Sequence, residues 1–99
     1  MRIYISGPVT GVPDYRDNFE SAEQRIHKDI DENALVINPV RELGELPELK
    51  YEEYMKISLH LLSLCDAIYM LDGWQQSPGA NRELDYALAN EMLIIKAEK

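Results

Sequence analysis

The residue with the clearest capacity for chemistry is Glu83, which lies at the start of a predicted C-terminal helix. It follows Ser77-Pro78-Gly79, so its carboxylate is expected to point toward the mouth of a pocket in front of that helix. An acid at this position is also a common partner of the positive end of a helix dipole. The spacing from Ser77 to Glu83 is therefore a weak motif when it is taken alone.

Three further side chains could contribute to a site, and each has a simpler interpretation. Tyr4 lies within a predicted strand, where it could hydrogen-bond a catalytic carboxylate or simply pack in the core. Trp74 could stack on a base or anchor an interface between subunits. Asp72 could accept a hydrogen bond from a sugar hydroxyl or cap its own loop. Spacing alone does not decide between these interpretations.

The hydrophobic pattern predicts four strands that alternate with three helices. The strands are expected at residues 2–6, 34–38, 66–71 and 93–95, with the second strand buried on both faces. The first helix is expected to begin at a cap, either Asp17 or Asn18, and the other two to span residues 51–64 and 80–90. Residues 40–50 are expected to form an irregular, partly helical excursion.

Each helix carries an apolar stripe that should face the sheet. The predicted inward residues are Phe19, Ala22, Ile26 and Ile30 in the first helix, Tyr54, Ile57, Leu61 and Leu64 in the second, and Leu84, Ala87 and Leu88 in the third. Within the first strand, alternation places Ile3 and Ile5 on the face opposite Tyr4. Strands that alternate with helices in this way indicate an α/β fold with a parallel sheet.

Two loops at the carboxyl edge of this sheet are the expected place for a ligand. One loop runs from Ser6 to Gly11 and the other from Asp72 to Gly79, and both contain glycines that let the backbone approach a ligand closely. Each loop alone is explained as a tight turn. Because both loops lie on one edge, we expect a pocket between them, and the helix that follows the second loop offers a place for an anionic group of a ligand.

The composition limits what the chain could bind. Its 99 residues suffice for one domain, residues 1–99, and so small a domain is expected to gain stability by forming a homo-oligomer, a dimer or larger. A net charge of −8 argues against long nucleic acid. One cysteine and two distant histidines predict no disulfide and no metal site, and no cofactor is implied. No segment predicts a membrane span or a signal peptide, so we expect a cytoplasmic protein.

Two segments carry a family resemblance over nearly the whole chain. These are Ile3-Tyr4-Ile5-Ser6-Gly7-Pro8-Val9-Thr10-Gly11 and Cys65-Asp66-Ala67-Ile68-Tyr69-Met70-Leu71-Asp72-Gly73-Trp74, supported by Ser77-x-Gly79-x-x-x-Glu83-Leu84-x-x-Ala87. Together they resemble the nucleoside 2-deoxyribosyltransferase superfamily, which includes deoxynucleoside 5'-monophosphate N-glycosidases. They are most similar to a small branch met in bacteriophage and prophage genomes.

The resemblance implies a flavodoxin-like (Rossmann-like) three-layer sandwich with a four- to five-stranded parallel sheet, together with glycosidic chemistry. In such enzymes a glutamate attacks C1' of the deoxyribose, and water or another base completes the reaction. Glu83 would be the nucleophile, and Tyr4 would orient it. Ser77 would contact the 5' end of the substrate. The candidate ligand-binding residues are Ser6, Gly7, Gly11, Ser58, Asp72, Trp74, Ser77, Gly79 and Asn81.

Two departures from the family pattern leave a second function open. The family's usual aspartate before the third strand falls on Ser58, whose hydroxyl cannot do the acid–base work of a carboxyl group. The sequence given also ends at Lys99, ahead of the C-terminal segment with which larger members complete a neighbouring pocket. We therefore weigh an N-glycosidase or transferase against a weak or inactive protein that sequesters a nucleotide or nucleotide-derived signal. A purely structural protein that only keeps the fold is the third hypothesis.

Overall fold

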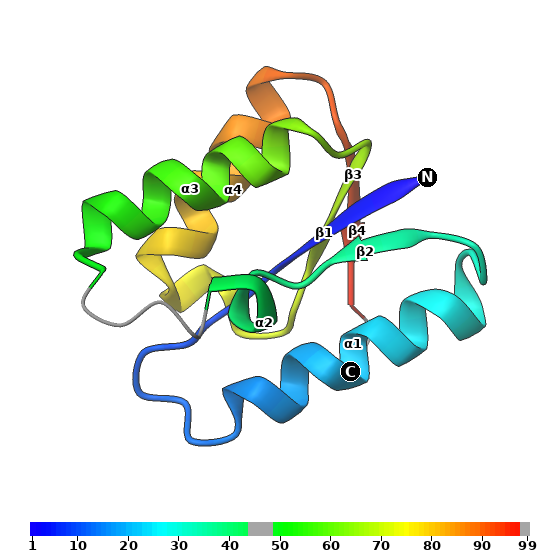
Figure 1. Cartoon of the computed structure of the whole chain (residues 1–99), viewed down its shortest axis with the longest axis horizontal. Coiled ribbons are helices and arrows are strands. Elements are labelled where there is room, and N and C mark those ends of the chain that lie inside the picture. Colours follow the sequence, from blue (N-terminus) through cyan, green and yellow to red (C-terminus); the bar gives the residue numbers. More distant parts are fainter. Residues whose placement is uncertain (44–48, 98–99) are drawn as a thin grey trace.

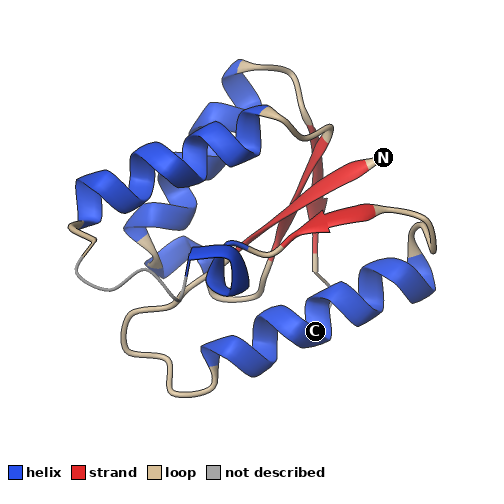
Figure 2. Ribbon diagram, in the orientation of Figure 1, coloured by secondary structure: helices blue, strands red, loops and turns tan. Residues whose placement is uncertain are grey.

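The fold is built on four parallel strands in the order β2-β1-β3-β4. The computed structural model describes residues 1–43 and 49–97. Its strands are β1 (Arg2–Ser6), β2 (Leu35–Ile37), β3 (Ala67–Met70) and β4 (Leu93–Lys96). All three strand pairs are parallel, which confirms the predicted α/β class and gives the sheet four strands (Figures 1 and 2).

Helices cover both faces of the sheet. One face is covered by α1 (Tyr15–Asp29) and the other by α3 (Tyr51–Ser63) and α4 (Pro78–Ala89), as Figure 1 shows. A short helix, α2 (Pro39–Leu43), follows β2, and a 3-10 turn, η1 (Trp74–Gln76), follows β3. No helix in the described ranges is both long enough and apolar enough to span a membrane.

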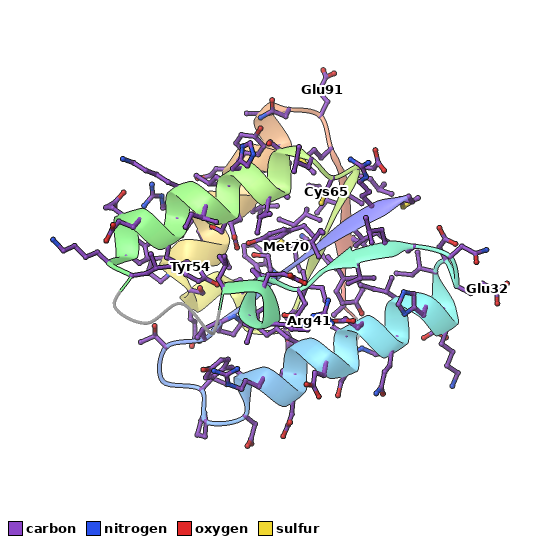
Figure 3. All side chains as sticks on the ribbon, viewed as in Figure 1. Glu32, Arg41, Tyr54, Cys65, Met70 and Glu91 are labelled. Atoms are coloured by element: carbon purple, nitrogen blue, oxygen red, sulfur yellow. The ribbon has the colours of Figure 1, made fainter. Side chains whose placement is uncertain are left out.

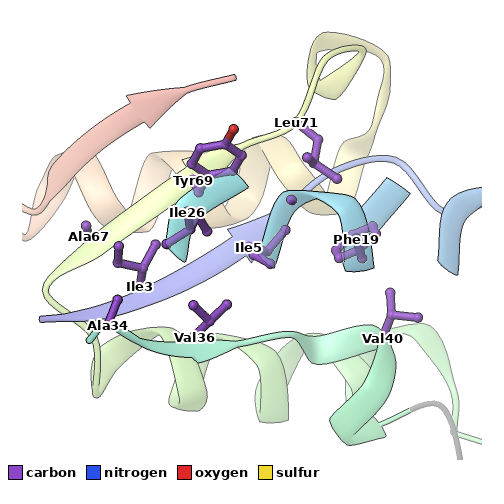
Figure 4. Packing of buried hydrophobic residues seen from close by; sticks show 11 residues of the cluster. Ile3, Ile5, Phe19, Ile26, Ala34, Val36, Val40, Ala67, Tyr69 and Leu71 are labelled. Carbon is purple, nitrogen blue, oxygen red and sulfur yellow. The ribbon is translucent and has the colours of Figure 1, made fainter. Parts of the chain in front are cut away.

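The alternation of side chains along β1 divides the core in two, as predicted. Ile3 and Ile5 pack with Phe19 and Ile26 of α1 (Figure 4). Tyr4 faces the opposite side, where it joins the cluster formed with α3 and α4. All of these side chains are buried, so β1 is a central strand that contributes to both hydrophobic layers.

Two predicted features of the first half are wrong. Helix α1 begins at Tyr15, so Asp17 and Asn18 lie inside it, and Asp14 occupies the cap position without a side-chain hydrogen bond. The second strand is not buried on both faces, because β2 is at the edge of the sheet and Leu35 is 56% exposed. The predicted excursion at 40–50 contains part of α2, while residues 44–48 lie outside the described residues.

Helices α3 and α4 are rotated relative to their predicted orientation. In α3 the buried residues are Met55, Ser58 and Leu62, whereas the predicted inward residue Leu64 is half exposed at the C-cap. The buried stripe of α3 is therefore shifted by one residue from the predicted stripe. The prediction missed it because one of its members is a serine, which a search for apolar residues leaves out.

In α4, Ala87 is buried as predicted, but Leu88 is exposed and Glu83 is buried. The helix also begins earlier than predicted, at Pro78. Ser77 caps it by accepting a hydrogen bond from the Ala80 N–H at 3.2 Å. Glu83 therefore lies in the second turn of the helix and not in the first.

Candidate functional site

The loops after β1 and β3 border one cavity at the carboxyl edge of the sheet. These strands are neighbours in the sheet, so their carboxyl ends lie side by side. The cavity has a volume of about 970 Å³. Its walls also include residues of α1, α2 and α3, and the start of α4 closes one side. Such a volume and such walls are typical of a small-molecule site.

Glu83 lies in the wall of this cavity and is only 6% exposed. The hydroxyl of Ser6 donates to Glu83 Oε1 at 2.7 Å, and the phenol of Tyr4 donates to Glu83 Oε2. Tyr4 and Ser6 are two residues apart on β1, so both side chains point to the same face of the sheet. A rigid central strand thus fixes the carboxylate through both of its oxygens.

Burial and hydrogen bonding act on Glu83 in opposite directions. Burial raises its pKa above the ordinary value, while the hydroxyls of Tyr4, Ser6 and Ser58 lower it. Burial and the charge of Glu83 raise the pKa of Tyr4 well above 10, so Tyr4 stays protonated and remains a donor. The effect of burial is the larger, so the pKa of Glu83 is raised overall, and the hydrogen bonds hold its carboxyl group in a fixed orientation.

Ser58, expected near the leaving base, lies behind the cavity wall. Its side chain is fully buried, and its hydroxyl donates to the Met55 carbonyl at 3.2 Å. It is not among the residues that line the cavity, although its hydroxyl acts on the pKa values of both Glu83 and Tyr4. Ser58 therefore supports the Tyr4–Glu83 pair from behind and does not face the cavity.

Five of the predicted ligand-binding residues line the cavity: Gly7, Gly11, Asp72, Ser77 and Gly79. A side chain at Gly7 would place its Cβ 2.7 Å from the Cβ of Leu71, so only glycine fits beneath this loop. Gly11 has a φ of +78°, which side chains rarely tolerate. These glycines let the backbone of the first loop form part of the wall.

Two other predicted ligand-binding residues lie away from the cavity. Trp74 packs beside the second core cluster, and the Lys96 ammonium lies 5.5 Å from the centre of its ring. The Asn81 amide donates to the carbonyls of Trp74, Gln75 and Ser77. Asn81 therefore holds the shape of the second loop, and neither residue is among those that line the cavity.

Three tyrosines that the sequence analysis did not assign to the site also line the cavity: Tyr15, Tyr51 and Tyr54. Tyr54 of α3, which is labelled in Figure 3, was predicted to face the core, but it lies in the wall of the cavity. Burial and the charge of Glu83 raise the pKa of Tyr54 to about 12. The sequence did contain a signal for this position of Tyr54. Tyr54 is four residues from Ser58, a predicted site residue, and residues four apart share a helix face.

The charges around the cavity are acidic. Its described wall contains Asp72 and Glu83 but no lysine, arginine or histidine. Within residues 1–43 and 49–97, no three histidine, cysteine, aspartate or glutamate side chains form a group that could hold a metal ion.

Residues 1–96 match the family model described as "Domain of unknown function (DUF4406)". The chain belongs to this family. A search of curated proteins finds no match to the DUF4406 chain. Among solved structures, it is similar to "2-desoxiribosyltransferase from Leishmania mexicana", with a TM-score of 0.69 and 19% sequence identity.

The structural match covers 96% of the DUF4406 chain and 62% of the Leishmania protein, so the chain spans less than two thirds of that protein. The likeness confirms the fold implied by the resemblance noted in the sequence. The strand order also follows the flavodoxin-like pattern, in which ligands bind beside the first and third strands.

Proposed function

We propose that the DUF4406 chain cleaves or exchanges the N-glycosidic bond of a deoxynucleoside or deoxynucleoside 5'-monophosphate. The observation that carries this proposal is the buried carboxyl group of Glu83, held by Tyr4 and Ser6 in the wall of a cavity of about 970 Å³. The fold likeness to a 2-desoxiribosyltransferase supports it. The function is therefore that of a hydrolase or transferase with a glutamate nucleophile.

In the first step, an oxygen of Glu83 forms a bond to C1' of the sugar while the bond from C1' to the base nitrogen breaks. The electron pair of that bond leaves with the base. In the second step, water or another base attacks C1', and Glu83 is released as a carboxylate. Tyr4 and Ser6 hold the carboxylate in one orientation and prevent the side chain from rotating, so that it is aligned for attack.

The loop residues supply the contacts that hold the sugar. Ser77 and Gly79 at the start of α4 would contact the 5' end through the Ser77 hydroxyl and the Gly79 N–H, because both residues line the cavity there. Gly7 and Gly11 would bring backbone groups close to the ring. We also propose that the protein works in the cytoplasm as a homo-oligomer, with exposed apolar side chains such as Leu88 and Leu93 available for contact.

The test is incubation of the protein with each deoxynucleoside and each 5'-monophosphate, with free base followed by chromatography. We expect base release by the wild type and a loss of at least about a hundredfold with Glu83→Gln, which keeps the size of the side chain. A folded wild type that releases no base from any substrate would rule out the enzyme.

A second candidate is a protein that binds a nucleotide without cleaving it. Ser58 favours this candidate, because a buried serine stands where the related enzymes carry an acid. It predicts a higher melting temperature with nucleotide, since a ligand that binds only the folded state stabilises it. Recovery of the ligand intact after incubation would distinguish this candidate from the enzyme.

A further inference from the structure

Departure of a base from deoxyribose requires a proton donor, and the residues already described do not supply one. The phenol of Tyr4 is committed to Glu83. Ser58 is buried behind the wall and bonded to a backbone carbonyl. Asp72 is the other acid in the described wall, but its side chain is exposed. The pKa of Glu83 is raised by burial, and no second carboxylate contributes to that rise.

Tyr54 is the side chain that fits this need. It lines the same cavity as Glu83, from a helix that packs against α4. It lies one helical turn before Ser58, so it occupies the same face of α3, but unlike Ser58 it lines the cavity. We propose that Tyr54 donates the proton to the departing base, in place of the carboxyl group that α3 lacks. This inference rests on the proposed function.

The other two tyrosines of the wall are less suited to this role. Tyr51 is half exposed at the rim, where the Arg82 guanidinium lies 5.6 Å from the centre of its ring. Tyr15 belongs to α1, and the Arg16 guanidinium lies 5.4 Å from its ring centre. Tyr54 lines the cavity together with Glu83, and burial followed by the charge of Glu83 raises the pKa of its phenol to about 12.

The proton is accounted for through both steps. While Glu83 attacks C1', the O–H bond of Tyr54 breaks, and its proton joins the electron pair that the base nitrogen takes from C1'. Formation of the ester removes the negative charge of Glu83, which is one of the causes of the raised Tyr54 pKa. Tyr54 therefore becomes a stronger acid at the moment when the base becomes negative. In the second step the Tyr54 phenolate takes a proton from the attacking water, and Glu83 leaves C1' with its electron pair.

The test compares Tyr54→Phe with the wild type on two substrates. The first is the deoxynucleoside that the wild type cleaves best. The second is 4-nitrophenyl 2-deoxy-β-D-ribofuranoside, whose 4-nitrophenolate leaves without protonation. We expect kcat on the nucleoside to fall about 10²- to 10⁴-fold with KM little changed, and kcat on the aryl substrate to stay within about tenfold of the wild type.

Tyr69→Phe is the matched control, because it removes the phenol of a buried tyrosine on β3 that does not line the cavity, and it should leave both rates within about tenfold of the wild type. An equal loss on both substrates, a loss confined to KM, or no loss at all in Tyr54→Phe would overturn the assignment while the proposed function stands. A wild type that is folded, as judged by its melting curve, but releases no base would overturn both.

Discussion

Replacing Tyr4 by phenylalanine would remove one of the hydroxyls that hold Glu83 and leave the aromatic ring in place. The phenol is fully buried and donates to Glu83 Oε2, so its loss leaves a buried carboxylate with one fewer donor. A hydrogen bond to a charged group contributes about 1.5–3 kcal/mol to stability. For a domain of this size, that corresponds to a fall in melting temperature of about 6–24 °C.

The loss should depend on pH in a specific direction. The pKa of Glu83 in the folded protein is already raised above 4.5 by burial, and the Tyr4 hydroxyl lowers it, so Tyr4→Phe raises it further. Below about pH 4.5, Glu83 is protonated in both proteins and only a neutral hydrogen bond of about 1 kcal/mol is lost. As the pH rises through the folded pKa of Glu83, the wild type gains an ionised carboxylate that Tyr4 stabilises, so the difference grows.

The assay is urea unfolding of both proteins at about pH 4 and about pH 8, where the raised pKa of Tyr4 keeps that phenol protonated. Tyr69→Phe serves as the control, because Tyr69 is a buried tyrosine of β3 that faces the α1 side of the sheet. Its effect should be the same at both pH values. A Tyr4→Phe effect that is equally independent of pH would refute the assigned coupling between Tyr4 and Glu83.

Three further predictions follow from the same geometry. Gly7→Ala places a Cβ 2.7 Å from Leu71, so we expect a loss of about 1–3 kcal/mol in urea unfolding, and unchanged stability would contradict the close approach. Ser58→Asp buries a second carboxyl group near Glu83, so we expect it to destabilise the protein by roughly 1–3 kcal/mol. The loss of stability should be larger at pH 8 than at pH 4. An increase in activity would contradict the position of Ser58 behind the cavity wall. Because the described wall holds no basic side chain, we expect kcat/KM for a deoxynucleoside to exceed that for its 5'-monophosphate by about tenfold or more; the reverse order would show that a phosphate is recognised.

The sequence was sufficient for the architecture because strand patterning depends on local alternation. Residues 2–6 were predicted and observed as a strand, and the opposite orientations of Ile3 and Tyr4 followed from the two-residue repeat. The burial of β2 could not be predicted in the same way. Whether a strand is at the centre or the edge of a sheet depends on the order in which distant segments pair, and an apolar run does not specify that order.

For the site, the sequence indicated the two loops and the pair of Tyr4 and Glu83, but not how α3 is turned. An apolar stripe through Tyr54 and Ile57 was predicted as the inward face, and Ser58, which lies outside that stripe, was predicted as a ligand-binding residue. In the structure the serine is buried because it can bond a backbone carbonyl within its own helix, which satisfies its hydroxyl without water. That one-residue shift is what brings Tyr54 into the cavity.

A covalent bond between Glu83 and the sugar can be detected by mass spectrometry of the protein quenched in acid during turnover of a deoxynucleoside. We expect a peptide containing Glu83 to gain the mass of one deoxyribosyl group, and we expect no such adduct with Glu83→Gln. Base release by the wild type with no adduct, or with an adduct on another residue, would contradict the proposed covalent bond.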